Sequence, residues 1–258
     1  MIWYRQALLS YKGLFLWLNW FGYISNIFLR PVLMVLLFSL TGRFARGESA
    51  VETFAIGMTA YGIANLLMGG IMQGFYYERS FATLSMLFAS SGSRLQNYLC
   101  RGVFHWPNAI VGVVMGMLAA KFILGVDFAG ANWPAASVAF VLMTTTVALF
   151  ALFLGNFCIP VRDWQAIYGS TQIAFLALTG ALIPTSSLPV GLHELSYVLP
   201  MTHGLEAARA AFDGAGLSTI SDQLLLEALV GIAYGFAGFS LFRVFELRAR
   251  QSGAYEMS

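Results

Sequence analysis

Residues 135–158 read AASVAFVLMTTTVALFALFLGNFC and contain no charged side chain. A helix needs about 20 mostly apolar residues to cross the hydrocarbon core of a bilayer, and this stretch is long enough to do so. It therefore predicts a membrane-spanning helix and indicates an all-α membrane protein.

The composition of the whole chain agrees with this prediction. Of its 258 residues, 59% are hydrophobic and 10% are charged, whereas a soluble domain carries about 25% charged residues. The mean hydropathy is +0.73. The chain has too few polar residues to cover the surface of a water-exposed globule. We therefore expect its apolar surface to contact a lipid membrane. No basic run suggests a nucleic-acid partner.

Five other stretches are apolar enough to span, which gives six predicted spans in one transmembrane domain over residues 1–258. The spans cover residues 21–40, 54–75, 103–124, 135–158, 164–183 and 224–245. Residues 1–20 mix apolar and polar side chains and predict an amphipathic helix lying in the membrane interface. The glycines of Met68-Gly69-Gly70 and of Gly112–Gly116 predict close contact between helices.

The lysines and arginines of the predicted loops indicate the orientation, because cytoplasmic loops carry an excess of both. With the N-terminus inside, nine fall on the cytoplasmic side and four on the opposite side. We therefore expect both termini in the cytoplasm. The nine are Arg5, Lys12, Arg79, Arg94, Arg101, Arg162, Arg243, Arg248 and Arg250, and the four are Arg43, Arg46, Lys121 and Arg209.

Two long connections are predicted to hold short helices. In the cytoplasmic segment 76–101, four large apolar residues predict one face of a short helix that suits a groove on a partner protein: Phe81, Leu84, Leu87 and Phe88. A helix resting on the inner leaflet is the alternative, but anionic lipids would repel Glu78.

In the external segment 184–222, helices at 193–199 and 203–212 are separated by Pro200 and are expected to re-enter the outer leaflet. They would cap the exit path, or act as a structural plug.

Arg30 lies inside the first predicted span, one turn after Asn26 and directly before Pro31, which would kink the helix. A charge in a span usually faces a partner or a cavity. Arg30 would line a translocation path or pair across a dimer; snorkelling to the cytoplasmic interface is the alternative. The candidate path residues are Asn26, Arg30, Asn65, Gln73, Thr145 and Gln172, for most of which hydrogen bonds between helices are the simpler role.

The chain has no phosphate-binding loop of the form G-x-x-x-x-G-K-[ST], so it is not expected to hydrolyse ATP by itself. Its two cysteines, Cys100 and Cys158, show no metal or redox spacing, and its three histidines are isolated. We expect no catalytic residues, no metal site and no cofactor bound by this chain.

Two motifs stand in the long connections. The inner one has Glu78-Arg79, Thr83-Leu84, Leu87 and Ser93-Arg94; the outer one has Gly180, Pro184, Leu188-Pro189, Leu199–His203, Glu206, Arg209 and Gly214. They resemble the signatures of the type-2 ABC permeases, the membrane subunits of exporters for drugs, peptides and polysaccharides. Ala82 stands where that family usually has Gly, Ser91-Gly92 where it has Pro, and Leu199 where it has Asn.

The resemblance implies a permease of the bacterial inner membrane that pairs with a second copy of itself or a related permease. It also implies a separate ABC ATPase subunit, which binds ATP and Mg and pushes a coupling helix in this chain to drive export of an amphiphilic cargo. The implied coupling residues are Glu78, Arg79, Phe81, Thr83, Leu84, Leu87, Phe88 and Arg94. The implied external gate residues are Pro184, Pro189, Pro200, His203 and Arg209.

An ATP-independent carrier or channel is the alternative function. Coupling to an ion would need paired charges inside the membrane. We expect Arg30 to be the only charge in a span, which disfavours this alternative. A membrane-embedded enzyme would need titratable groups converging in one pocket, and the sequence shows none.

Overall fold

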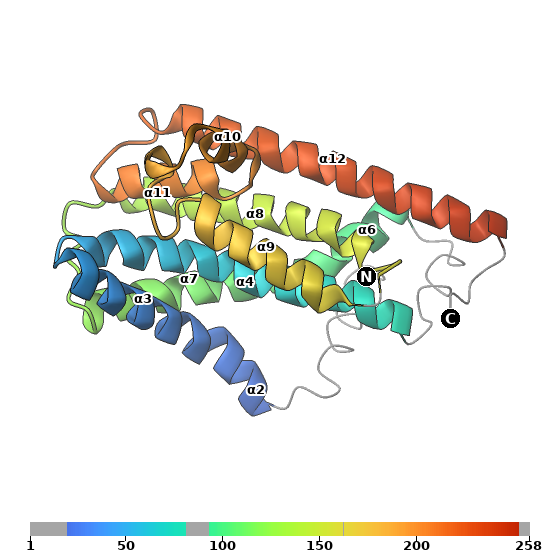
Figure 1. Cartoon of the computed structure of the whole chain (residues 1–258), viewed down its shortest axis with the longest axis horizontal. Coiled ribbons are helices and arrows are strands. Elements are labelled where there is room, and N and C mark those ends of the chain that lie inside the picture. Colours follow the sequence, from blue (N-terminus) through green and yellow to red (C-terminus); the bar gives the residue numbers. More distant parts are fainter. Residues whose placement is uncertain (1–19, 81–92, 162, 253–258) are drawn as a thin grey trace.

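The computed structural model of the chain describes residues 20–80, 93–161 and 163–252. Within these residues the regular structure is entirely helical, and the long helices run along the longest axis of the molecule (Figure 1). The predicted all-α class is therefore confirmed. The first 19 residues of the predicted interfacial helix and the central part of the predicted coupling segment, residues 81–92, lie outside the described residues.

Helices overlap all six predicted spans, but their ends differ from the predicted ones. They are α2 Trp20–Ile24, η1 Ser25–Leu29, α3 Arg30–Arg46, α4 Ala50–Ser80, α6 Arg94–Val103, α7 His105–Phe122, α8 Trp133–Phe157, α9 Trp164–Leu178, η2 Thr185–Ser187, α10 Val190–Val198, α11 Thr202–Phe212 and α12 Ser221–Ser252. Residues 76–80 and 94–101, expected in the inner connection, belong to α4 and α6. The two expected external helices correspond to α10 and α11.

Five helical segments in the described part are long and apolar enough to cross a membrane: Ser25–Arg46, Ala50–Glu78, Tyr98–Phe122, Trp133–Phe157 and Ser221–Arg248. The fifth predicted span corresponds to α9, which has 15 residues. That is shorter than the roughly 20 residues of a full crossing. The six-span arrangement therefore stays a prediction.

The first span contains one turn of π-helix, η1, where the backbone N–H of Arg30 bonds to the carbonyl of Ser25. Pro31 follows directly and has no N–H to donate, so the regular pattern of α-helical hydrogen bonds is already interrupted there. Wide turns of this kind often mark functional positions in helices. The π turn ends at Leu29, two residues before Pro31, and the kink expected at Pro31 stays a prediction.

The loops alternate between the two ends of the bundle. The connections 47–49, 123–132 and 213–220 lie together at the left of Figure 1, whereas α4 and α12 extend toward the right. Consecutive long helices on either side of these connections, α3 and α4 or α7 and α8, are therefore antiparallel, as expected of a chain that crosses a membrane repeatedly.

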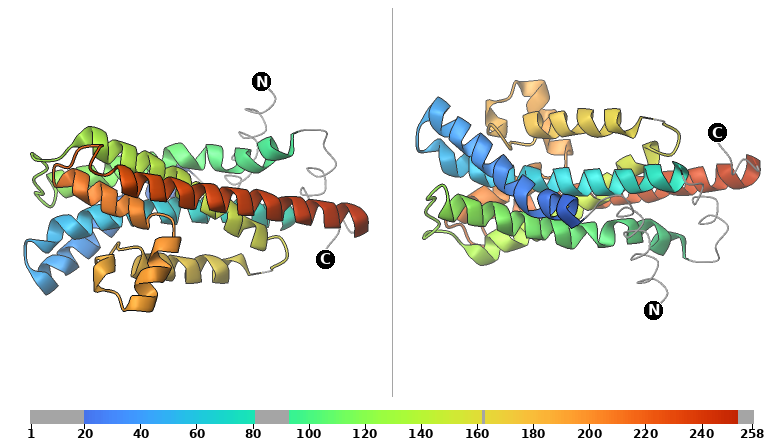
Figure 2. Two further views of the ribbon diagram at one scale, coloured as in Figure 1. Left: turned by 90° about the horizontal axis from the view of Figure 1, so that it is seen from above. Right: turned by 90° about the horizontal axis from the view of Figure 1, so that it is seen from below.

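Helix α4 forms the centre of the bundle. It packs against α3, α7, α8 and α9, and Figure 2 shows α7 and α9 on opposite flanks of it. A Cβ atom on Gly112 would lie 2.8 Å from Leu66, and one on Gly116 would lie 2.7 Å from Thr59. The predicted close contact at these glycines is confirmed, and it brings α7 against α4. The large side chains of α12, by contrast, are mostly exposed, which suits a helix that faces lipid.

Candidate functional site

An ion pair joins the two helices that flank the predicted coupling segment. In α6, Nε and Nη2 of Arg101 donate to Oε2 of Glu78 in α4, at 3.0 and 2.6 Å. The Arg101 side chain is 2% exposed and that of Glu78 is 20% exposed. The guanidinium also lies over the rings of Phe75 and Phe242, 4.4 and 5.2 Å from their centroids. We call these four residues the inner clamp.

The inner clamp continues into an aromatic contact around Tyr98 of α6. The Tyr98 ring is buried and meets Phe75 of α4 edge-on at 6.3 Å, and its centroid lies 5.2 Å from that of Phe242. Asn156 of α8 donates from Nδ2 to the Tyr98 hydroxyl at 3.3 Å and to the carbonyl of Gly238 at 3.1 Å. Together these contacts fix α4, α6, α8 and α12 to one another next to the coupling segment.

The predicted coupling residues can be placed only at the borders of the segment. Glu78 is held by Arg101. Arg79 falls within α4 and Arg94 begins α6, but their side chains lie outside the described part of the chain. Phe81, Thr83, Leu84, Leu87 and Phe88 also lie outside it.

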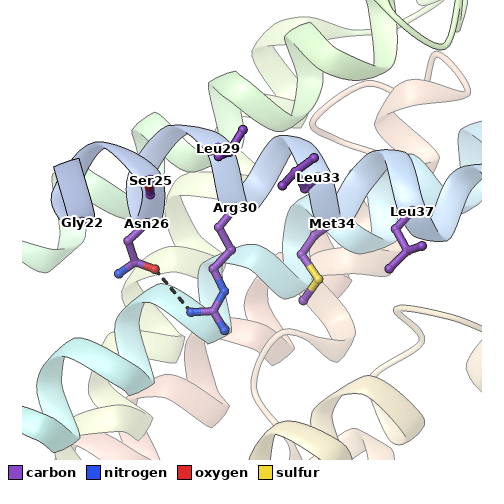
Figure 3. Close-up of a pocket in the computed structure, with 8 residues that line it drawn as sticks. All are labelled: Gly22, Ser25, Asn26, Leu29, Arg30, Leu33, Met34 and Leu37. Atoms are coloured by element: carbon purple, nitrogen blue, oxygen red, sulfur yellow. Dashed lines mark hydrogen bonds between the residues drawn. The ribbon is translucent and has the colours of Figure 1, made fainter.

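Arg30 lies in a surface groove of about 460 Å³ along the first span. Its Nη1 donates to Oδ1 of Asn26 at 3.3 Å, and Figure 3 shows both side chains pointing from the helix to the same side. A smaller hollow joins these two residues to Gly62 and Asn65 of α4. Among the described residues, no carboxylate forms an ion pair with Arg30. The groove is otherwise mostly apolar: its remaining lining residues are Gly22, Ser25, Leu29, Leu33, Met34 and Leu37.

Other polar groups line the neighbouring contact between α4 and α9. Gln172 is buried, and its Nε2 donates to the carbonyl of Ala64 at 3.3 Å. The Tyr168 hydroxyl donates to the carbonyl of Asn65 at 3.5 Å and lies within electrostatic range of Arg30. We call Asn26, Arg30, Asn65, Tyr168 and Gln172 the polar cluster.

The structure thus brings four of the six candidate path residues together and leaves two apart. Gln73 lies two turns further along α4, where it donates to the Tyr77 hydroxyl at 3.1 Å. Thr145 lies on α8 and accepts a hydrogen bond from Nε1 of Trp106 in α7 at 3.2 Å. Its hydroxyl therefore faces α7 rather than the polar cluster.

The predicted gate residue Arg209 ties α11 to α4 and to the end of α9. Its Nη2 donates to the carbonyl of Gly180 at 2.7 Å and to that of Thr53 at 3.4 Å. Burial lowers the pKa of the Arg209 guanidinium, and the nearby Glu206 opposes that shift. Glu206 itself accepts a hydrogen bond from the Thr185 hydroxyl at 2.6 Å. These bonds hold the loop that leads from α9 to α10 against α11.

The other predicted gate residues surround the turn between α10 and α11. The His203 ring stacks on Tyr197 at 5.0 Å, and its Nε2 donates to the Tyr197 carbonyl at 3.2 Å. Pro200 is buried in that turn, whereas Pro184 and Pro189 are exposed ahead of η2 and α10. The five residues therefore lie in the segment from Pro184 to α11 but do not converge on a single point.

Glu227 of α12 has an unusual environment that sequence reasoning did not anticipate. Its side chain is fully buried within a candidate span, so the expectation that Arg30 is the only charge in a span is wrong. It accepts hydrogen bonds from the backbone N–H groups of Met201 and Gly204 and from the Thr146 hydroxyl. An acidic residue inside the sixth predicted span was the available signal.

Comparisons with known proteins agree with the resemblance seen in the sequence. The family model described as ABC-2 type transporter matches residues 2–212. The capsule polysaccharide export inner-membrane protein CtrC of Neisseria meningitidis serogroup B is 24% identical over 226 residues, which cover 84% of this chain and 82% of that protein. Its counterpart from serogroup A is 24% identical over 222 residues, with the same coverage.

Proposed function

Because the chain belongs to the ABC-2 type transporter family, we propose that it is the permease subunit of an exporter that moves a polysaccharide-containing cargo out of the cytoplasm. A separate ABC ATPase subunit, with ATP and Mg bound to it, supplies the energy. The observation that carries this proposal is the family match over residues 2–212, which extends from before the first span to the end of α11. The names of the two relatives point to polysaccharide as the cargo.

The proposed topology puts the inner clamp and the C-terminal end of α12 on the cytoplasmic side of a bacterial inner membrane, together with the N-terminus. The excess of arginine and lysine in the corresponding segments supports this orientation. The common position of the connections 47–49, 123–132 and 213–220 at the other end supports it as well. In this orientation the ATPase docks on residues 79–94, and α10 and α11 face the outside.

The proposed cargo path runs along the polar cluster. Arg30, Asn65, Tyr168 and Gln172 come from three helices and offer hydrogen-bonding groups at a face that is otherwise apolar. Hydroxyl-rich sugars need such groups in place of water, and aromatic rings can pack against the sugar faces. A second permease copy facing this side would enclose the path between two such clusters. Gln73 extends it toward the inner end of α4.

The inner clamp supports the proposed coupling. A segment that transmits force must be anchored at both ends, and Glu78 and Arg101 join its two flanks directly. Through Phe242 the same contact reaches α12, so a push on the segment would be shared by three helices.

Reconstitution tests the proposed function. The chain is purified from its native membrane under mild detergent, and an ATP-hydrolysing partner should purify with it. The complex in proteoliposomes should then translocate radiolabelled native surface polysaccharide only when ATP and Mg are supplied. Uphill transport by vesicles that contain this chain alone would contradict the proposal and favour the ATP-independent carrier.

A further inference from the structure

The carboxylate of Glu227 acts as the N-terminal cap of a neighbouring helix. Oε1 accepts the Met201 N–H at 2.8 Å, and Oε2 accepts the Gly204 N–H at 3.0 Å. The first N–H groups of a helix have no partner within the helix, and Met201 makes no side-chain cap for α11. A side chain of α12 therefore fixes the start of α11.

The turn that Glu227 holds has an unusual backbone. Met201 has φ of 84°, the only positive φ of a non-glycine residue in the described part of the chain. Side chains rarely adopt this conformation, and it persists only where the surroundings hold it. Here Pro200 precedes it in a buried turn, and the N–H of Met201 itself bonds to Glu227. The capping contact thus fixes the entry to α11 as well as its first turn.

A third helix joins the same contact. The Thr146 hydroxyl of α8 also donates to Oε1 of Glu227. A Cβ atom on Gly231 of α12 would lie 2.5 Å from Cγ2 of Thr146, so the backbone of α12 lies directly against α8. A Cβ atom on Gly204 would lie 3.1 Å from Met143 and 3.3 Å from the Glu227 carboxyl carbon. The middle of α8, the start of α11 and the first turns of α12 therefore meet around one carboxylate.

The other end of α12 belongs to the inner clamp. Phe242 lies under the Arg101 guanidinium and against Tyr98, and the Gly238 carbonyl accepts the Asn156 side chain. Phe242 follows Glu227 by 15 residues, which corresponds to about 22 Å along a helix. Helix α12 runs unbroken between the two positions.

We propose that α12 transmits movement from the flanks of the coupling segment to the external helices, and that Glu227 is the positioning residue through which α11 follows it. The proposal rests on the proposed function, since it assumes that an ATPase moves the inner clamp. The continuous helix between two fixed contacts is the physical link. Without the Glu227 contact, α12 would still move, but the turn at Met201 and α10 ahead of it would no longer follow.

Distance measurements between spin labels on the permease–ATPase complex test this inference, with ATP plus vanadate as the only probe. The reference label is placed at Glu48 in the loop between α3 and α4. One partner label replaces Asp222 at the start of α12, and the other replaces Glu194 on α10; all three side chains are exposed. In the complex with unchanged Glu227, nucleotide should change both the 48–222 and the 48–194 distances.

The substitution Glu227→Gln keeps the size of the side chain but places an NH₂ group where one of the two N–H donors needs an acceptor. The nucleotide-driven change at 48–194 should then disappear, whereas that at 48–222 should remain. Asp213→Asn is the matched control, because it makes the same chemical change at an exposed position at the end of α11. Both distance changes should persist in that variant.

The outcomes separate this inference from the function on which it rests. If nucleotide changes neither distance in the complex with unchanged Glu227, the coupling to an ATPase is itself wrong. The role of Glu227 is wrong, and the exporter function stands, if Glu227→Gln keeps both distance changes at full size. The same holds if only the 48–222 distance responds when Glu227 is intact.

If Glu227→Gln does not accumulate in the membrane, Glu227→Asp is used in its place, because its shorter side chain withdraws the carboxylate from both N–H groups. A full-size change at 48–194 in that variant overturns the inference.

Discussion

Arg101 donates two hydrogen bonds to a single oxygen of Glu78, and this pair closes the chain segment between α4 and α6. The two residues are 23 positions apart in sequence. The pair fixes the ends of the segment whatever conformation the residues between them adopt. Its burial between Phe75 and Phe242 makes it an element of the helix packing and not a surface contact.

The substitution Arg101→Leu should therefore destabilise the protein strongly. Removing one partner of a buried pair leaves an uncompensated charge and costs about 3 kcal/mol or more, and the stacking of the guanidinium on two rings is lost as well. The free energy of unfolding, measured by SDS titration in mixed micelles, checks this. Arg43→Leu is the matched control: it breaks the exposed pair with Glu48, whose loss should cost about 1 kcal/mol or less. Equal losses in the two variants would contradict the structural role of the inner clamp.

Gly57 is the point at which α4 approaches the loop after α9. A Cβ atom there would lie 2.0 Å from the Ala181 carbonyl oxygen and 3.1 Å from Nη2 of Arg209. Gly57→Ala must displace backbone, so it should cost about 1–3 kcal/mol and release the 179–189 loop. Gly74→Ala in the same helix meets nothing within 4 Å and should leave stability unchanged or raise it by up to about 1 kcal/mol. Protease accessibility of the 179–189 loop, compared between the two variants, measures the displacement.

Five of the long helices could be predicted because the signal for a span is local. Length and apolar composition determine it, and α3, α4, α7, α8 and α12 lie where the sequence indicates. Residues 94–101 were expected in the connection between two spans, yet they belong to α6, an amphipathic helix that buries Tyr98, Cys100 and Arg101 against the bundle. Its face is set by packing partners in α4, α8 and α12, which the local sequence does not reveal.

The contacts of Glu227 show the other limit of sequence reasoning. The residue stands visibly in a predicted span, but two of its three partners are backbone N–H groups more than 20 positions away. Backbone donors leave no pattern in the side chains. The polar cluster was predicted better, since Asn26 and Arg30 are one turn apart on one helix, where spacing alone puts them together.

The coupling segment can be located by crosslinking. A cysteine replacing Ser85 should form a crosslink to the ATPase subunit, with a yield that changes when ATP plus vanadate is added. The chain's own thiols should give little background, because Cys100 and Cys158 are buried. A cysteine replacing Asp127, which lies in the exposed loop at the opposite end of the bundle, is the control and should not crosslink. A helix that rests on the inner leaflet would leave the residue-85 thiol uncrosslinked in every nucleotide state.

Arg30 offers the sharpest test of the proposed path. The guanidinium of Arg30, which directly follows a π turn, reaches into an apolar groove. Its hydrogen-bond partners there are Asn26 and the Tyr168 hydroxyl, and no described carboxylate forms an ion pair with it. Such a cation is costly within a membrane unless the cargo or a facing subunit uses it. Arg30→Leu should therefore lower ATP-driven polysaccharide export in proteoliposomes by about tenfold or more, as expected for the loss of a charge-assisted hydrogen bond.

Arg30→Lys should retain part of the export activity, because the charge remains and only the planar geometry is lost. Arg46→Leu, at the exposed end of the same helix, should export at the normal rate. Normal export by Arg30→Leu would remove Arg30 from the path and leave snorkelling to the interface as its role.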